Sequence, residues 1–210
     1  MYESLNQDVL DQVPAASKGV LDLGCGSGLM GGWIKKKLGC HVTGITWSQA
    51  EAESAKDLLD QVLIADLNSL DAQALGVFDC VVCSHVLEHL VEPERLLLSV
   101  RRAISLRGTL VVALPNLLYW RQRLRLLKGE FRYTDGGLMD RTHVRFFDWA
   151  SAAALVEQAG FTIKDRQATG HVPGSRWFGR RLGGRIDALG LRYFPGLLGH
   201  QFVLVCQPRG

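Results

Sequence analysis

The feature that most constrains the fold of this chain is the segment V-L-D-L-G-C-G-S-G at residues 20–28, where an apolar run enters a glycine-rich turn. The next residues, Leu29–Leu38, have the pattern of a helix that Gly39 ends. A strand that turns directly into a helix is typical of a parallel sheet covered by helices. Glycines also let the backbone approach a ligand closely, and a helix start presents free N–H groups.

The rest of the chain repeats this alternation of short apolar runs and helical patterns. Further helices are predicted from Ser48 to about Asp60, from Pro93 to about Ile104, and over Trp149–Ala159. Seven strands are predicted, at Gly19–Leu23, His41–Ile45, Val62–Ala65, Phe78–Cys83, Thr109–Leu114, Phe161–Arg166 and Gln201–Cys206. We therefore expect an α/β fold, a doubly wound, seven-stranded, mostly parallel sheet with helices on both faces. Its ligands should bind beyond the carboxyl ends of the strands.

The length of 210 residues suggests a single domain, residues 1–210. Two segments, at about 116–147 and 169–200, are too long to be simple connectors and are expected to form a cap on the substrate side.

The composition fits a globular protein, with 47% hydrophobic and 21% charged residues. The net charge of +3 is too small to indicate nucleic-acid binding. We expect a cytoplasmic protein, because a secretory signal is not recognisable and the apolar runs are shorter than the ~20 residues of a membrane span. Cys80 and Cys83 would face opposite sides of a strand, which favours buried structural thiols over a zinc or redox pair.

Two ligands compete for the glycine turn. Residues 26–31 match the G-x-G-x-x-G of dinucleotide sites, but such sites need an acidic residue at the end of the second strand, where Thr46 and Trp47 stand. Asp22 precedes the first glycine. A carboxylate beside turn amides suits the amino-acid end and the sulfonium of S-adenosylmethionine.

At this point the sequence resembles the class I S-adenosylmethionine-dependent methyltransferases. L-D-L-G-C-G-S-G matches their first motif, and the resemblance continues in A-D-L at 65–67, F-D-C-V-V at 78–82 and V-L-E-H-L at 86–90. It covers residues 18 to 206.

The resemblance implies a set of cofactor-binding residues. They are Asp22, Gly24, Cys25, Gly26, Gly28, Thr46, Trp47, Asp66, Leu67 and Ser84. Many members have Asp or Glu at the position of Thr46, where it holds both ribose hydroxyls. Loss of that charge-assisted pair would weaken binding by roughly 1–2 kcal/mol unless another group, for which Trp47 is a candidate, compensates.

A first group of candidate acceptor-side residues lies in H-V-L-E-H at 85–89, where three polar side chains share a face if the turn is helical. Related quinone O-methyltransferases have Glu-x-x-Glu-His here and look metal-dependent, whereas this chain has His85 in first place. We expect no metal, a catalytic role for His85 and an acceptor contact for His89. The alternative is that Glu88 and His89 form a structural pair.

A second group combines P-N-x-x-x-W at 115–120 with D-R-T-H-V-R-F-F at 140–147. It resembles a subfamily associated with glycan and secondary-metabolite modification. His143 can exchange a proton near neutral pH and is the expected catalytic base, while Arg141 could hold an anionic acceptor. The expected acceptor-binding residues in this group are Asn116, Trp120, Asp140 and Arg141. The alternative is that Asp140, Arg141 and His143 only pin the insertion.

Basic charge gathers in two segments. Residues 117–132 and 171–200 each carry a net charge of +4, leaving −5 on the rest of the chain. A basic segment with aromatic residues can lie on an anionic membrane or grip a phosphate-bearing acceptor. The alternative is a solvated face whose apolar side covers the sheet. RNA is disfavoured because the arginines are not accompanied by a recognisable RNA-binding module.

The expected activity is methylation, on oxygen, of a small-molecule or glycan-type acceptor, without nucleic acid as a partner. A rival hypothesis comes from residues 115–129, which also look like the methionine-biosynthesis W proteins. Those keep the methyltransferase fold and serve an acyltransferase partner. The D-R-T-H continuation favours the enzyme.

Overall fold

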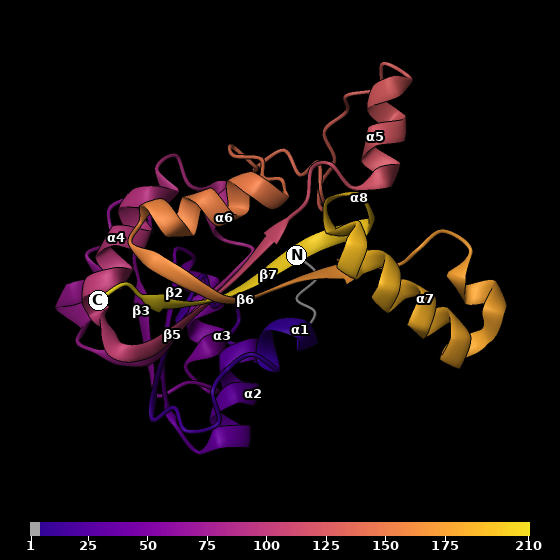
Figure 1. The fold of residues 1–210 in the computed structure, drawn as a ribbon. Helices are drawn as coiled ribbons and strands as arrows, with labels where there is room; N and C mark the ends of the chain where they lie inside the picture. The colour runs from indigo at the N-terminus through magenta and orange to yellow at the C-terminus, as the bar shows by residue number, and fades with distance from the viewer. Residues whose placement is uncertain (1–4) are drawn as a thin grey trace.

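The computed structural model describes residues 5–210 and contains one seven-stranded sheet (Figure 1). The strands are β1 (Gly19–Leu23), β2 (His41–Thr46), β3 (Gln61–Ile64), β4 (Phe78–Ser84), β5 (Ile104–Pro115), β6 (Phe161–Gly170) and β7 (Gly199–Pro208). Their order in the sheet is β3-β2-β1-β4-β5-β7-β6, and β7 runs antiparallel to both of its neighbours. The predicted fold class is confirmed.

Helices cover both faces of the sheet. The helices that pack on it are α1 (Gln7–Leu10), α2 (Leu29–Leu38), α3 (Gln49–Ala55), α4 (Pro93–Ala103) and α6 (Trp149–Gln158). Figure 1 shows α2 and α3 on one side of the sheet and α4 and α6 on the other. Alternate residues of the central strands feed two separate cores: Val20 packs with α2, whereas Leu21 packs with α4. The strand order reverses between β1 and β4, and a ligand crevice is expected at such a point.

Helix α3 is shorter than predicted. It ends at Ala55 instead of continuing to Asp60, because Asp60 is part of the sheet edge. The side chain of Asp60 accepts a hydrogen bond from the N–H of Val42 at 2.8 Å, and its own N–H donates to the Val42 carbonyl at 3.1 Å. Strand β5 is longer than predicted, since it already begins at Ile104, which pairs with Phe78.

All five cysteines are buried. Cys80 belongs to the core on the α2 side and Cys83 to the core on the α4 side, as the strand pattern predicted. Burial raises the pKa of both thiols well above the usual range. They are packing residues.

The two insertions carry their own helices. The first contains α5 (Trp120–Leu127), and the second contains the short turn η3 (Ser175–Phe178), α7 (Gly179–Tyr193) and α8 (Pro195–Leu198). Helices α5 and α7 project away from the sheet in Figure 1. Among residues 5–210, none of the helices is both long and apolar enough to cross a membrane.

Candidate active site

The glycine turn joins β1 to α2 in a left-handed backbone conformation. Gly24, Gly26 and Gly28 have φ values of 74°, 54° and 84°, which disfavour residues with a Cβ atom. The N–H groups of Gly24 and Cys25 both donate to the Ile45 carbonyl at 2.9 Å and so tie the turn to the end of β2. The positive φ angles of the turn therefore explain why glycine occupies these three positions.

The turn also packs against the segment that follows β4. A Cβ atom on Gly24 would lie 2.5 Å from Cγ2 of Val86, so the two segments touch. This contact brings the donor-side and acceptor-side groups expected from the sequence next to each other.

The side chains of Asp22 and Cys25 are buried at the glycine turn. Asp22 is fully buried, and its Oδ2 lies close to α2, 3.2 Å from where a Cβ atom on Gly31 would stand. Cys25 is 7% exposed. Asp22 is thus buried between the end of β1 and α2, next to the turn.

The end of β2 carries an acidic group that the sequence analysis missed. The hydroxyl of Thr46, itself buried, donates a 2.6 Å hydrogen bond to Oε2 of Glu51 and accepts one from the N–H of Ser48 at 3.2 Å. Ser48 caps α3 as predicted, but the Glu51 carboxylate pairs with Thr46 instead of closing a capping box. The Trp47 ring is 78% exposed and available for stacking.

The ends of β3 and β4 contribute further polar groups. Asp66 is exposed and accepts hydrogen bonds from the backbone and side-chain nitrogens of Asn68 at 2.9 and 3.0 Å, which lower its pKa. Leu67 packs on the core beside it. Ser84 is half-buried and accepts a 3.4 Å hydrogen bond from Nδ2 of Asn6. Left-handed glycines, an acidic group at β2 and an exposed ring at Trp47 fit the parts of S-adenosylmethionine.

His85 begins the acceptor-side group and has a positive φ of 55°. Its Nδ1 lies 3.1 Å from Oε1 of Glu88, and its Nε2 lies 2.6 Å from Oε1 of Gln201. Burial alone would lower the pKa of His85, but the hydrogen bond and charge of Glu88 outweigh it and raise that pKa. His85 therefore holds the Glu88 carboxylate in place.

Glu88 stands at the centre of this group and is fully buried. Its Oε1 lies 4.0 Å from Nε2 of His143, and its Oε2 lacks a hydrogen-bond partner within the described residues. Its backbone carbonyl accepts the N–H groups of Val144 and Arg145 at 2.9 and 3.0 Å. Glu88 thus fastens the D-R-T-H segment to the turn after β4, and its carboxylate separates two histidines.

His143 is 9% exposed. Its Nδ1 lies 3.3 Å from the Leu138 carbonyl, which leaves Nε2 turned towards Glu88. Burial is the main cause that lowers the pKa of His143, so the imidazole is neutral near neutral pH. A neutral, buried imidazole beside a carboxylate is suited to accept a proton.

His89 completes the cluster from the exposed side. Its ring meets the His143 ring edge-on at 4.7 Å, and its Nδ1 lies 3.1 Å from the Thr142 hydroxyl. The ligand atoms of Glu88, His89 and His143 lie within 4.8 Å of one another, a spacing that could hold a metal ion.

The remaining acceptor-side residues occupy different environments. Asp140 accepts hydrogen bonds from the N–H and hydroxyl of Thr142 at 2.8 and 2.6 Å, which lower its pKa and shape the turn before His143. Arg141 points to solvent and pairs with Asp135 at 2.7 Å. Trp120 is half-buried at the start of α5.

Asn116 corrects an expectation from the sequence. It is fully buried, and its Nδ2 donates to the carbonyls of Gly196 and Gly199 at 3.0 and 2.7 Å. Its Oδ1 accepts the N–H of Leu118 at 3.0 Å. With its hydrogen-bonding groups used inside the fold, Asn116 braces the two insertions against each other and is not exposed to an acceptor.

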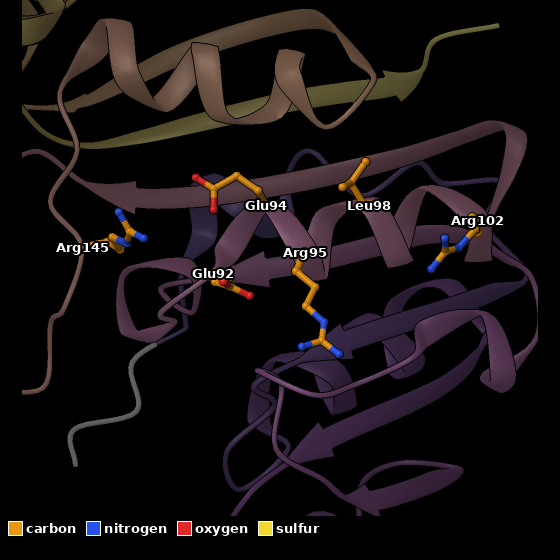
Figure 2. A pocket seen from close by; sticks show the side chains of 6 residues that line it. All are labelled: Glu92, Glu94, Arg95, Leu98, Arg102 and Arg145. Atoms are coloured by element: carbon orange, nitrogen blue, oxygen red, sulfur yellow. The ribbon is translucent and has the colours of Figure 1, made fainter.

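A surface hollow lies on the outer side of α4 and is shown in Figure 2. It is lined by Glu92, Glu94, Arg95, Leu98, Arg102 and Arg145. The guanidinium of Arg145 donates to the Val91 carbonyl. The hollow contains none of the glycine turn or of the His–Glu cluster, so it is separate from the candidate site.

The fold and the glycine turn define a class I methyltransferase. In agreement, a family described as a methyltransferase domain matches residues 2–165, and the chain belongs to it. The expected class of S-adenosylmethionine-dependent methyltransferases and the expected cofactor are confirmed at the level of the family.

The individual relatives share between 24% and 33% of the aligned residues with this chain. The chain is 24% identical over 180 residues to the ubiquinone biosynthesis O-methyltransferase of Aeromonas salmonicida, covering 81% of this chain and 73% of the relative. It is 32% identical over 119 residues to that of Dechloromonas aromatica, covering 53% and 51%. It is also 33% identical over 122 residues to an uncharacterized 37.1 kDa protein in transposon TN4556 of Streptomyces fradiae, covering 55% and 34%. The chain thus spans between about a third and three quarters of these relatives.

Solved structures confirm the fold. An S-adenosylmethionine-dependent methyltransferase from Mesorhizobium loti superposes with a TM-score of 0.65 at 17% identity, covering 96% of both chains. One from Archaeoglobus fulgidus gives the same TM-score and identity, covering 92% of this chain and 87% of its own. These relatives and structures give no support to the rival acyltransferase-subunit hypothesis.

Proposed function

We propose that this protein methylates a hydroxyl group of a small-molecule or glycan-type acceptor. The observation that carries the proposal is the buried Glu88 carboxylate between His85 and His143, in the turn that touches the glycine loop at Val86. A hydroxyl that becomes an ether must lose its proton, and this cluster can take it. The O-methyltransferase relatives agree with oxygen as the acceptor atom.

S-adenosylmethionine, when bound, supplies an electrophilic methyl group on a sulfonium sulfur. The chain itself must hold the acceptor oxygen in line and remove its proton. Nε2 of His143 takes this proton, since Nδ1 is directed to the Leu138 carbonyl. The Glu88 carboxylate, 4.0 Å away, then stabilises the imidazolium. His85 keeps Glu88 in position and is a positioning residue in this scheme.

The exposed residues around the cluster would bind the acceptor. Arg141 exchanges its solvent-exposed partner Asp135 for an anionic group of the acceptor. His89 supplies a ring surface beside His143, and Trp120 supplies a second ring from the first insertion. This arrangement favours an aromatic or sugar hydroxyl on a molecule that carries a negative charge.

The test is a screen of phenols and sugar acids with labelled S-adenosylmethionine, followed by mass spectrometry of the product. We expect an O-methyl product that the His143→Ala variant forms much more slowly while binding the donor normally. His41→Ala, at an exposed histidine on β2, is the matched control and should keep full activity. A methyl group on nitrogen or carbon, or full activity in His143→Ala, would refute the proposal. Donor binding without turnover, together with capture of an acyltransferase, would favour the subunit hypothesis.

A further inference from the structure

One side of helix α7 is fixed against the segment that leads into it, residues 172–175. Asp187, in the middle of the helix, accepts a 2.7 Å hydrogen bond from the N–H of Val172. A Cβ atom on Gly183 would lie 2.4 Å from the Ser175 carbonyl oxygen, and one on Gly190 would lie 2.4 Å from Val172. Residues spaced by four and then three positions share one side of a helix. The inner side of α7 is therefore formed by two glycines and an aspartate.

A flank of α7, about a quarter turn from that inner side, is apolar and exposed. Leu182, Leu189 and Tyr193 are 52%, 57% and 67% exposed, and their spacing of seven and four places them on a common stripe. Trp177 and Phe178, at the end of η3 just before α7, are also exposed, by 90% and 58%. Surface helices normally turn their apolar stripe inward. Leu182, Leu189 and Tyr193 do not cover the sheet.

Arginines border this stripe. Arg181, Arg185 and Arg192 are exposed and follow one another at spacings of four and seven, so they form a parallel row. The last of them, Arg192, also borders a surface hollow with Trp149 and Arg166. We call the two rows together the outer face of α7: Leu182, Leu189 and Tyr193 with Arg181, Arg185 and Arg192. Asp187, the acidic residue of residues 171–200, is turned to the inner side. The outer face therefore carries three of the five arginines of residues 171–200 and is not neutralised by Asp187.

An apolar row beside a cationic row, as on the outer face of α7, indicates the kind of partner that this face binds. An anionic bilayer offers phosphate groups to guanidinium groups and an apolar layer directly beneath them to leucine and aromatic side chains. A helix that projects from the body, as α7 does in Figure 1, can lie flat on such a surface. Tyrosine and tryptophan are also the residues that favour the boundary between head groups and acyl chains.

We propose that the outer face of α7 docks this protein on anionic phospholipid membranes. The leucines, Tyr193 and Trp177 enter the head-group boundary, while the three arginines bind lipid phosphates. The inference goes beyond the proposed function, because it concerns where the enzyme works and holds for any acceptor.

The experiment measures co-sedimentation of the full chain, without methyl donor, with vesicles of phosphatidylglycerol and phosphatidylcholine or of phosphatidylcholine alone. We expect binding to the anionic vesicles only, weakened by added salt. The double variant Arg181→Ala/Arg185→Ala should lower the partition coefficient roughly 30-fold. Leu182→Glu/Leu189→Glu should abolish binding. Leu106→Glu, at a leucine 89% exposed on β5, is the matched control and should bind as the wild type does.

Each alternative has its own outcome. Wild-type protein that stays in solution with both vesicles overturns the proposal, as does undiminished binding by the leucine double variant. A wild-type dimer that Leu182→Glu/Leu189→Glu converts to a monomer would show that a second copy covers this face. Binding to single-stranded RNA but not to vesicles would assign the arginines to nucleic acid. Circular dichroism of each variant checks that α7 is still folded.

Discussion

The hydroxyl of Thr46 donates a 2.6 Å hydrogen bond to the carboxylate of Glu51 at the end of β2. In the class I methyltransferases that the sequence resembles, many members have an acidic residue at the position of Thr46, and this chain places the acid five residues later, at the start of α3. The carboxylate returns to the same edge because Ser48 caps α3 there and starts the helix next to Thr46. The pair thus restores a negative group where the donor ribose is expected.

Glu51→Gln is predicted to weaken binding of S-adenosylmethionine about 5- to 30-fold, which corresponds to about 1–2 kcal/mol for a lost charge-assisted hydrogen bond. Isothermal titration calorimetry measures it. Glu53→Gln, two residues along the same helix and exposed in an ion pair with Lys56, is the control. Equal affinity in wild type and Glu51→Gln would show that Trp47 or another group holds the ribose.

Gly26→Val is predicted to abolish donor binding, because a side chain would fill the space that the left-handed turn leaves for the ligand. Gly39→Val is the control, since Gly39 has a similar φ of 65° but open space around it at the end of α2. Both changes should cost about 1–2 kcal/mol of unfolding free energy for the left-handed backbone. Only Gly26→Val should lose the calorimetric signal. Donor affinity retained in a folded Gly26→Val protein would move the site elsewhere.

The sheet and the glycine turn could be predicted because their signals are local. Apolar runs, capping residues and glycines act within a few neighbours in the chain, and the predicted strands all exist. The end of α3 was not predicted correctly, because Asp60 joins the sheet through Val42 instead of continuing the helix.

The candidate site was only partly predictable, because its contacts join distant segments. Glu88 meets His143 across 55 positions and His85 meets Gln201 across 116 positions, and such pairs exist only after the sheet has formed. Asn116 lies in a motif that indicated a binding site, but its side chain is buried and hydrogen-bonded inside the fold. The orientation of α7 depends on Gly183 and Gly190, whose importance shows only in the packed structure.

Asn116→Ala is predicted to destabilise the fold by about 1–3 kcal/mol, because the buried carbonyls of Gly196 and Gly199 lose their donor. Urea unfolding measures this loss, and Gln167→Ala, at an exposed side chain of β6, should have little effect. The acceptor KM of folded Asn116→Ala should stay near the wild-type value. A raised KM with unchanged stability would return Asn116 to the acceptor site.

Dialysis against a chelator is predicted to leave turnover unchanged. Glu88, His89 and His143 lie close enough to hold a metal ion, but proton removal by His143 uses the neutral imidazole alone, and His89 is already engaged with Thr142. Turnover with EDTA, compared with an untreated sample, measures this. Activity that disappears and returns with Zn²⁺ or Mn²⁺ would make the cluster a metal site.

The pH dependence of kcat/KM tests His143 as the base. A base must be unprotonated, so the rate should rise with pH through the His143 pKa, which burial holds below the ordinary value of 6.5. The rate should then be level around neutral pH. Three neighbours face the ring: the charges of Glu88 and Asp140 raise its pKa, and that of His89 lowers it.

Two variants should therefore move the acidic limb of the profile in opposite directions. Glu88→Gln removes a negative charge that favours the imidazolium, so the limb should shift to lower pH. His89→Ala removes a positive charge that opposes it, so the limb should shift to higher pH, even if the rate itself falls through loss of acceptor contacts. His41→Ala should leave the limb in place. A limb that both cluster variants leave unmoved would assign the titration to another group and would exclude His143 as the base, whereas opposite shifts are not expected from a purely structural cluster.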